Sequence, residues 1–119
     1  MAGAVTECNG FRNFETWTVA LWLGNERCDY EHWRAEAIRC WTEAQFASAV
    51  IENRWSREEE TELHLSSCIA GAVRAAAEEV GNGLLRDLLT EALSSVAWHE
   101  VAAHFLAEIE EFGSSENVE

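Results

Sequence analysis

The order of hydrophobic and polar positions predicts helices along most of the chain. The run Phe14 to Leu23 is apolar on nearly every side, and a helix of this composition is normally buried. Asn13 precedes it as a typical N-cap, with Glu15 in the first turn, where the helix dipole favours an acid. Gly24 then favours a left-handed stop. We therefore predict that this first helix is the hub of the core.

Two longer segments carry apolar residues at the three- and four-residue spacing of a helix. The first runs from Asp29, as its cap, to about Ile51. Its predicted buried stripe is Trp33, Ala37, Cys40, Trp41 and Ala44. The second begins at a capping box, Ser56-x-x-Glu59, and ends at residues 81–83, Gly-Asn-Gly. Its predicted buried stripe is Leu65, Cys68, Ile69, Ala72, Val73, Ala76 and Val80.

Two shorter helices complete the pattern. Leu84 to Leu93 is expected to pack through Leu85, Leu88, Leu89 and Leu93. Ser94 and Ser95 are predicted to cap a last helix that ends at Gly113. One side of that helix carries Trp98, Val101, Ala102, Phe105, Ile109 and Phe112. The spacing thus predicts an all-α bundle of four or five helices with short connections.

Length and composition agree with this architecture. The chain has 119 residues and no proline, and its 18 alanines and 20 glutamates are strong helix formers. We predict one helical domain over residues 13–113. An irregular lead-in, residues 1–12, ends in the turn dipeptide Asn9-Gly10, and residues 114–119 form a flexible acidic tail.

The same composition indicates where the protein works. No apolar stretch approaches the length of a membrane span, and no secretory signal is visible. The four cysteines, which lack a Cys-x-x-Cys pair, are Cys8, Cys28, Cys40 and Cys68. We expect free thiols in the reducing cytoplasm of a host cell and no contact with a membrane.

Charge is strongly negative and unevenly distributed. The formal net charge is −14, of which residues 1–57 contribute −2 and residues 58–119 contribute −12. Such a surface repels phosphate backbones, so direct nucleic-acid binding is not expected. The acidic clusters are candidate partner-binding residues: Glu58, Glu59, Glu60, Glu62, Glu78, Glu79, Glu108, Glu110 and Glu111. The alternative is that they form only a solvated helix face.

Metal and catalytic motifs are weak. His99 and His104 nearly match a zincin pattern, but five residues place them about 140° apart around a helix. Glu100, His104 and Glu108 share one face, which favours an exposed polar stripe over a metal site. Cys28 and His32 are four apart, yet a cap at Asp29 would interrupt their helix. Cys40 and Cys68 fit buried stripes as core thiols. We therefore expect no metal, no cofactor and no enzymatic activity.

The six tryptophans are assigned mainly to the core. Trp17, Trp33, Trp41 and Trp98 fit buried stripes. Trp22 and Trp55 could anchor an interface, and Trp55 could also form a hydrophobic staple. The core is nevertheless the preferred prediction for both.

The opening segment carries a recognisable motif. Residues 9–26, NGFRNFETWTVALWLGNE, resemble the signature of an uncharacterised family of small proteins found in phages, plasmids and other mobile elements. Members of that family open with an Asn-Tyr-Glu-Thr-Trp type of motif, and Phe14 stands where tyrosine is usual. Residues 96–104, VAWHEVAAH, also resemble its last helix, so the resemblance spans about residues 11–111. It implies a genomic setting rather than an activity. The first role expected of Asn13, Glu15, Thr16 and Trp17 is structural.

This setting suggests three functional hypotheses. The leading one is a non-enzymatic, acidic inhibitor of a host defence nuclease or CRISPR effector subunit. Like some anti-restriction and anti-CRISPR proteins, it would present carboxylates to a basic protein that expects DNA phosphates. The second is an adaptor or assembly protein of the mobile element that binds through an apolar face, and a homodimer is compatible with it. The third is a small metal-dependent enzyme built around His99, Glu100 and His104.

Overall fold

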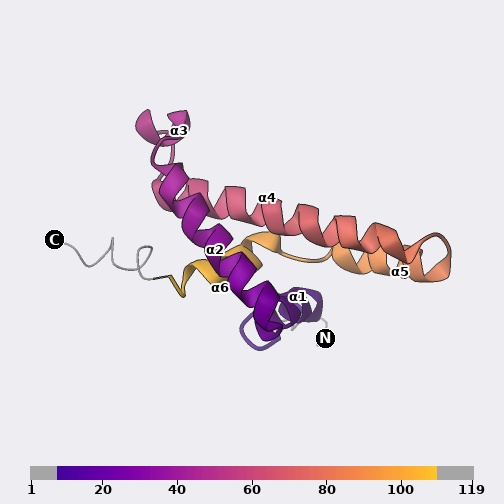
Figure 1. The fold of residues 1–119 in the computed structure, drawn as a ribbon. Coiled ribbons are helices and arrows are strands. Elements are labelled where there is room, and N and C mark those ends of the chain that lie inside the picture. Colours follow the sequence, from indigo (N-terminus) through magenta and orange to yellow (C-terminus); the bar gives the residue numbers. More distant parts are fainter. Residues whose placement is uncertain (1–7, 110–119) are drawn as a thin grey trace, which may run out of the picture.

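Six α-helices and one 3-10 turn make up most of residues 8–109, the part of the chain that the computed structural model describes (Figure 1). They are α1 (Phe14–Asn25), α2 (Arg27–Ala44), α3 (Ser48–Ile51), α4 (Arg57–Ala77), η2 (Glu78–Val80), α5 (Leu84–Leu93) and α6 (Trp98–Leu106). Within 8–109 there is no β-strand, and only an isolated bridge joins Cys8 to Phe11 around the predicted turn at Asn9-Gly10. The all-α prediction is confirmed. None of the described helices has the length and apolarity to cross a membrane.

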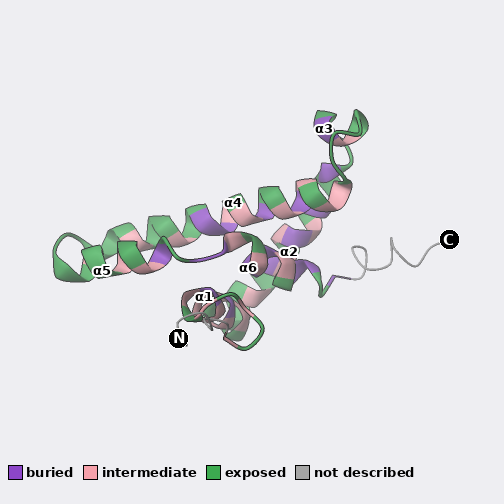
Figure 2. Ribbon diagram, turned by 180° about the vertical axis from the view of Figure 1, so that it is seen from behind, coloured by how far each residue is buried: buried purple, intermediate pink, exposed green. Residues whose placement is uncertain are grey.

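The core lies where α2, α4 and α6 cross. Both α2 and α6 pack against α4, and Figure 2 shows buried residues gathered at this crossing. The most deeply buried large side chains include Leu65 of α4 and Phe105 of α6. The prediction that the first helix is the hub is wrong, because only Thr16 and Ala20 of α1 are buried. Helix α1 packs against α2 and α6 on one side, and its other apolar side is left uncovered by the described residues.

The predicted helix from Asp29 to Ile51 is two helices. It begins earlier, at Arg27, so that Asp29 lies in its first turn instead of capping it. It ends at Ala44, where the chain turns: Phe46 N–H donates to the carbonyl of Glu43 at 3.0 Å instead of continuing the helical ladder. The short α3 then follows. This split accounts for six helices where four or five are predicted.

Helix α4 starts as predicted, and its buried residues extend no farther than Ala70. Ser56 accepts a hydrogen bond from Glu59 N–H at 3.0 Å, and the Glu59 side chain accepts one from Ser56 N–H at 2.9 Å, which completes the capping box. The predicted stripe fails farther along, where Ala72, Ala76 and Val80 are exposed. The reason is that the last part of α4, after Ala70, extends beyond the core as an arm with α5 beside it (Figures 1 and 2).

The last helix is shorter than predicted and has another cap. Its N-cap is Ala97, and Ser94 instead donates to the carbonyl of Glu91 at the end of α5. Ser94 and Ser95 are therefore wrong as caps. The helix ends at Leu106, and Phe112 and Gly113 lie outside the described residues, as does the predicted tail.

The tryptophans divide into buried and exposed groups. Trp33 and Trp41 are buried, as predicted, while Trp17 and Trp98 are half-buried. The core prediction is wrong for Trp22, 62% exposed, and Trp55, 42% exposed. Trp55 donates its Nε1–H to Glu60 at 2.8 Å.

Candidate functional site

The opening motif is a hydrogen-bonded joint between α1 and the loop that enters α6. Asn13 Oδ1 accepts from the backbone N–H of Thr16 at 2.8 Å and from its hydroxyl at 2.6 Å. Asn13 Nδ2 donates to the carbonyl of Ser95 at 2.8 Å. The hydroxyl of Thr16, which is fully buried, accepts from Ala97 N–H at 2.8 Å. Asn13 and Thr16 therefore fix the start of α1 to the start of α6.

The other two motif residues point to two different hollows. Glu15 lines an apolar groove described below. Trp17 borders a smaller hollow of about 250 Å³ with Tyr30, His104 and Glu108 among its other lining residues. There the Tyr30 hydroxyl donates to Glu108 Oε1 at 2.8 Å, and this hydrogen bond raises the pKa of Tyr30.

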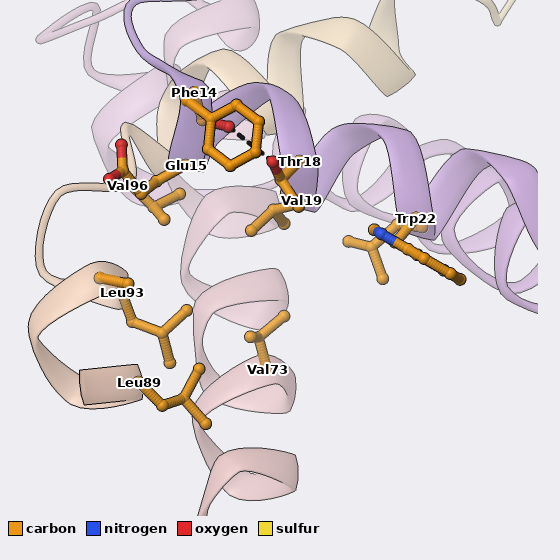
Figure 3. Close-up of a pocket in the computed structure, with 11 residues that line it drawn as sticks. Phe14, Glu15, Thr18, Val19, Trp22, Val73, Leu89, Leu93 and Val96 are labelled. Carbon is orange, nitrogen blue, oxygen red and sulfur yellow. Dashed lines mark hydrogen bonds between the residues drawn. The ribbon is translucent and has the colours of Figure 1, made fainter. Parts of the chain in front are cut away.

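An open apolar groove runs between α1, α4 and α5. It has a volume of about 340 Å³, and Figure 3 shows side chains from all three helices facing it. Its lining is Phe14, Glu15, Thr18, Val19, Trp22, Leu23, Val73, Leu89, Ala92, Leu93 and Val96. Phe14 is 60% exposed and Trp22 is 62% exposed, so the largest rings of the groove lie open to solvent.

The groove has few polar groups, and one of them already makes a hydrogen bond within the protein. Glu15 carries its only charge, and the Thr18 hydroxyl donates to the carbonyl of Phe14 at 2.8 Å, drawn as the dashed line in Figure 3. On α5 the apolar wall continues away from the groove. Leu85 and Leu88, predicted to pack in the bundle, are 69% and 58% exposed, which makes that prediction wrong. They lie one helical turn before Leu89 and Ala92 and extend the same apolar surface.

The predicted acidic residues form two separated groups on the described part of the chain. Residues 58–62 lie in the first turns of α4, and residues 78–79 follow its last turn. Glu62 and Glu78 are sixteen positions apart, which corresponds to roughly 24 Å along a helix, and none of the fifteen residues between them is acidic. Glu108 lies just after α6, and Glu110 and Glu111 lie outside the described residues.

Several of these carboxylates are already hydrogen-bonded. Glu59 belongs to the capping box, Glu60 accepts from Trp55, and Glu108 accepts from Tyr30. Glu62 is half-buried, while Glu78 and Glu79 are exposed. Glu59 and Glu108 are exposed as well, and partner binding by this set stays a prediction.

The histidine stripe considered for a metal has other contacts. Glu100 accepts from the backbone N–H of Arg12 at 2.7 Å, and the His104 ring packs against Phe11 and Phe105 with centroids 5.7 and 5.6 Å apart. His99 is exposed.

Three other possible metal ligands, which were not identified as a group from the sequence, lie close together between α2 and α4. The ligand atoms of Cys40, His64 and Cys68 all lie within 4.8 Å of one another. The available signal was the His64-x-x-x-Cys68 spacing, which puts both residues on one helix face. The third member lies on another helix, so the group becomes visible only in the fold. Also wrong is the predicted break between Cys28 and His32, because both lie within α2.

Comparison with known proteins gives one match. No curated protein and no solved structure matches the chain. A family model described as a family of unknown function (DUF7249) matches residues 4–116, nearly the whole sequence. The chain belongs to this family of unknown function, DUF7249.

Proposed function

We propose that this protein is a non-enzymatic binding protein whose groove between α1, α4 and α5 takes an amphipathic helix from a basic partner protein. The observation that carries the proposal is the open apolar lining, with two large aromatic rings more than half exposed. A contiguous apolar surface of this kind is typical of an interaction site in a folded domain. An amphipathic helix laid in a groove buries such a surface through residues at helical spacing.

The available apolar surface is large enough to support specific binding. Burying one large apolar side chain contributes about 1.5–3 kcal/mol. Because Phe14 and Trp22 are 60% and 62% exposed, covering the exposed part of both supplies roughly 2–4 kcal/mol before the entropic cost of association is subtracted. Leu85 and Leu88 extend the contact for a helix longer than the groove itself.

Charge favours a basic partner over a second copy of the chain. A formal charge of −14 makes two copies repel each other, whereas it attracts a helix with lysine or arginine on its polar face. Glu15, which lines the groove, provides an acidic group close to such a helix.

The two leading hypotheses from the sequence both fit this proposal. An adaptor of a mobile element and an inhibitor of a host defence protein would each bind a protein partner. They differ in the surface that carries the affinity: the adaptor uses the apolar groove, and the inhibitor uses the acidic clusters. The apolar groove is the more continuous of the two surfaces on the described residues, so we assign the main contact to it.

Three synthetic helical peptides test the assignment. The first has leucine and tryptophan anchors on one face and lysines on the other, the second replaces the lysines with glutamates, and the third replaces the anchors with serines. Fluorescence anisotropy should show binding of the first peptide only. Binding of the third peptide as tightly as the first would instead favour the acidic clusters. A concentration-dependent dimer without peptide, with no peptide bound, would favour a second copy as occupant.

Matched variants locate the peptide. Phe14→Ser and Trp22→Ser should each weaken binding of the first peptide about fivefold or more, because each removes roughly 1–2 kcal/mol of apolar contact with the peptide. Phe46→Ser and Ile51→Ser alter side chains that are 70% and 65% exposed away from the groove, and should leave the affinity unchanged. Equal losses in both pairs would overturn the assignment to the groove.

A further inference from the structure

The trio of Cys40, His64 and Cys68 has the chemistry of a metal site. Cys40 projects from α2 and is 2% exposed, whereas His64 and Cys68 are one turn apart on α4. All three ligand atoms lie within 4.8 Å of one another. Neither cysteine is in a disulfide. The two helices that hold the trio are in direct contact in the core, so these positions are fixed by the packing of the fold.

We propose that Cys40, His64 and Cys68 bind one Zn²⁺ ion in a Cys2His site with an open fourth position. Two sulfurs and one imidazole form a donor set that suits Zn²⁺ far better than Mg²⁺ or Ca²⁺. In a tetrahedral zinc site, bond lengths of about 2.0–2.3 Å place neighbouring ligand atoms roughly 3.3–3.8 Å apart. Since no two of these ligand atoms are more than 4.8 Å apart, the trio reaches this geometry when they approach by at most about 1–1.5 Å through side-chain rotation.

A bound dication would have to displace the protons of the two thiols. Burial raises the pKa of the Cys40 thiol to about 12, and the nearby Cys68 contributes in the same direction. Two adjacent thiolates are therefore unfavourable without a counter-charge. A dication offsets both negative charges, and binding releases the two thiol protons.

The surroundings leave room for a fourth ligand. His64 is exposed, and together with Cys68, Glu60, Leu63 and Ser67 it borders a solvent-facing hollow of about 440 Å³. Water can complete the coordination from that side. On the other side, Cys40 is adjacent to Trp41 in the core, so the ion would connect α2 to α4 at the buried crossing. This site is independent of the groove, and either proposal can fail without the other.

Cobalt substitution tests the site directly. The reduced, metal-stripped full chain is titrated with Co²⁺, and absorption is recorded. The wild type should bind one ion per chain, with thiolate-to-cobalt charge transfer and the intense visible bands of a tetrahedral site. Added Zn²⁺ should displace the cobalt, abolish these bands and raise the melting temperature.

Ligand variants and matched controls make the test specific. His64→Ala and Cys68→Ser should lower the affinity by about a hundredfold or more, since even groups that only support a ligand contribute ten- to a hundredfold. Cys28→Ser and His99→Ala change an exposed thiol and an exposed imidazole elsewhere and should retain full binding. Cys40→Ala is compared only after circular dichroism shows that it is folded. No cobalt spectrum in the folded, reduced wild type, or equal loss in the two control variants, would overturn the proposal.

Discussion

The hydroxyl of Thr16 is expected to be the most important single polar group in the opening motif. It is fully buried, donates to Asn13 Oδ1 at 2.6 Å and accepts from the Ala97 N–H at 2.8 Å. Thr16→Val keeps the shape of the side chain and removes both hydrogen bonds. Leaving the buried N–H of Ala97 without this acceptor costs about 1–3 kcal/mol, and the lost donation to Asn13 adds about 1 kcal/mol. We expect a total loss of about 2–4 kcal/mol in the free energy of unfolding.

Urea unfolding, followed by circular dichroism, measures this change. Thr16→Ser is the matched control, because it keeps the hydroxyl and loses one methyl group, at a cost of about 1 kcal/mol. Asn13→Ala and the double variant with Thr16→Val and Asn13→Ala complete a double-mutant cycle. Because the two residues belong to one hydrogen-bond network, their effects on the free energy of unfolding should be coupled by about 0.5–3 kcal/mol. If Thr16→Val proved no more destabilising than Thr16→Ser, the motif would not be the joint between α1 and α6 that we describe.

Three further predictions concern capping, pH and burial. Ser56→Ala should lower stability by about 1 kcal/mol in urea unfolding, because it removes the cap of α4, and an unchanged midpoint would contradict the role of the capping box. The hydrogen bond from Arg39 lowers the pKa of Glu36, so the wild type should be more stable than Glu36→Gln at neutral pH. That advantage should disappear in unfolding curves as the pH falls through the lowered pKa of Glu36. Trp22→Ala should change the free energy of unfolding by less than about 1 kcal/mol, whereas Trp41→Ala, at a side chain only 4% exposed, should cost about 3–5 kcal/mol. A larger loss for Trp22 in thermal or urea unfolding would place it in the core.

Local sequence signals predicted the starts of α1 and α4 but not those of α2 and α6. Asn13 caps α1, and Ser56 with Glu59 caps α4, because both arrangements depend on residues three positions apart. Such local signals could not identify the hydrogen-bond partner of the Thr16 hydroxyl. It is the N–H of Ala97, 81 positions along the chain, and no periodicity identifies a contact of that kind.

Helical periodicity identified apolar faces without showing which of them are covered. Trp33 and Leu65 meet other helices in the core, whereas Leu88 and Trp22 have the same apolar character and remain exposed. The difference arises from tertiary packing, since α5 contacts the end of α4 and leaves the groove open.

Tertiary packing also explains why the candidate metal site could not be identified from the sequence. The spacing of His64 and Cys68 is visible in the sequence, but Cys40 is a core thiol by its own pattern. Its Sγ joins the other two ligand atoms only because α2 crosses α4 at that level.

Binding of a partner helix in the groove between α1, α4 and α5 is tested most directly by methyl NMR. The chain is labelled at leucine and valine and titrated with the lysine-containing amphipathic peptide. Shifts are expected at Val73, Leu89 and Leu93, which line the groove, and none is expected at Leu63, which is outside it. Shifts that leave the groove methyls unchanged and affect Leu63 near the acidic start of α4 would contradict binding in the groove.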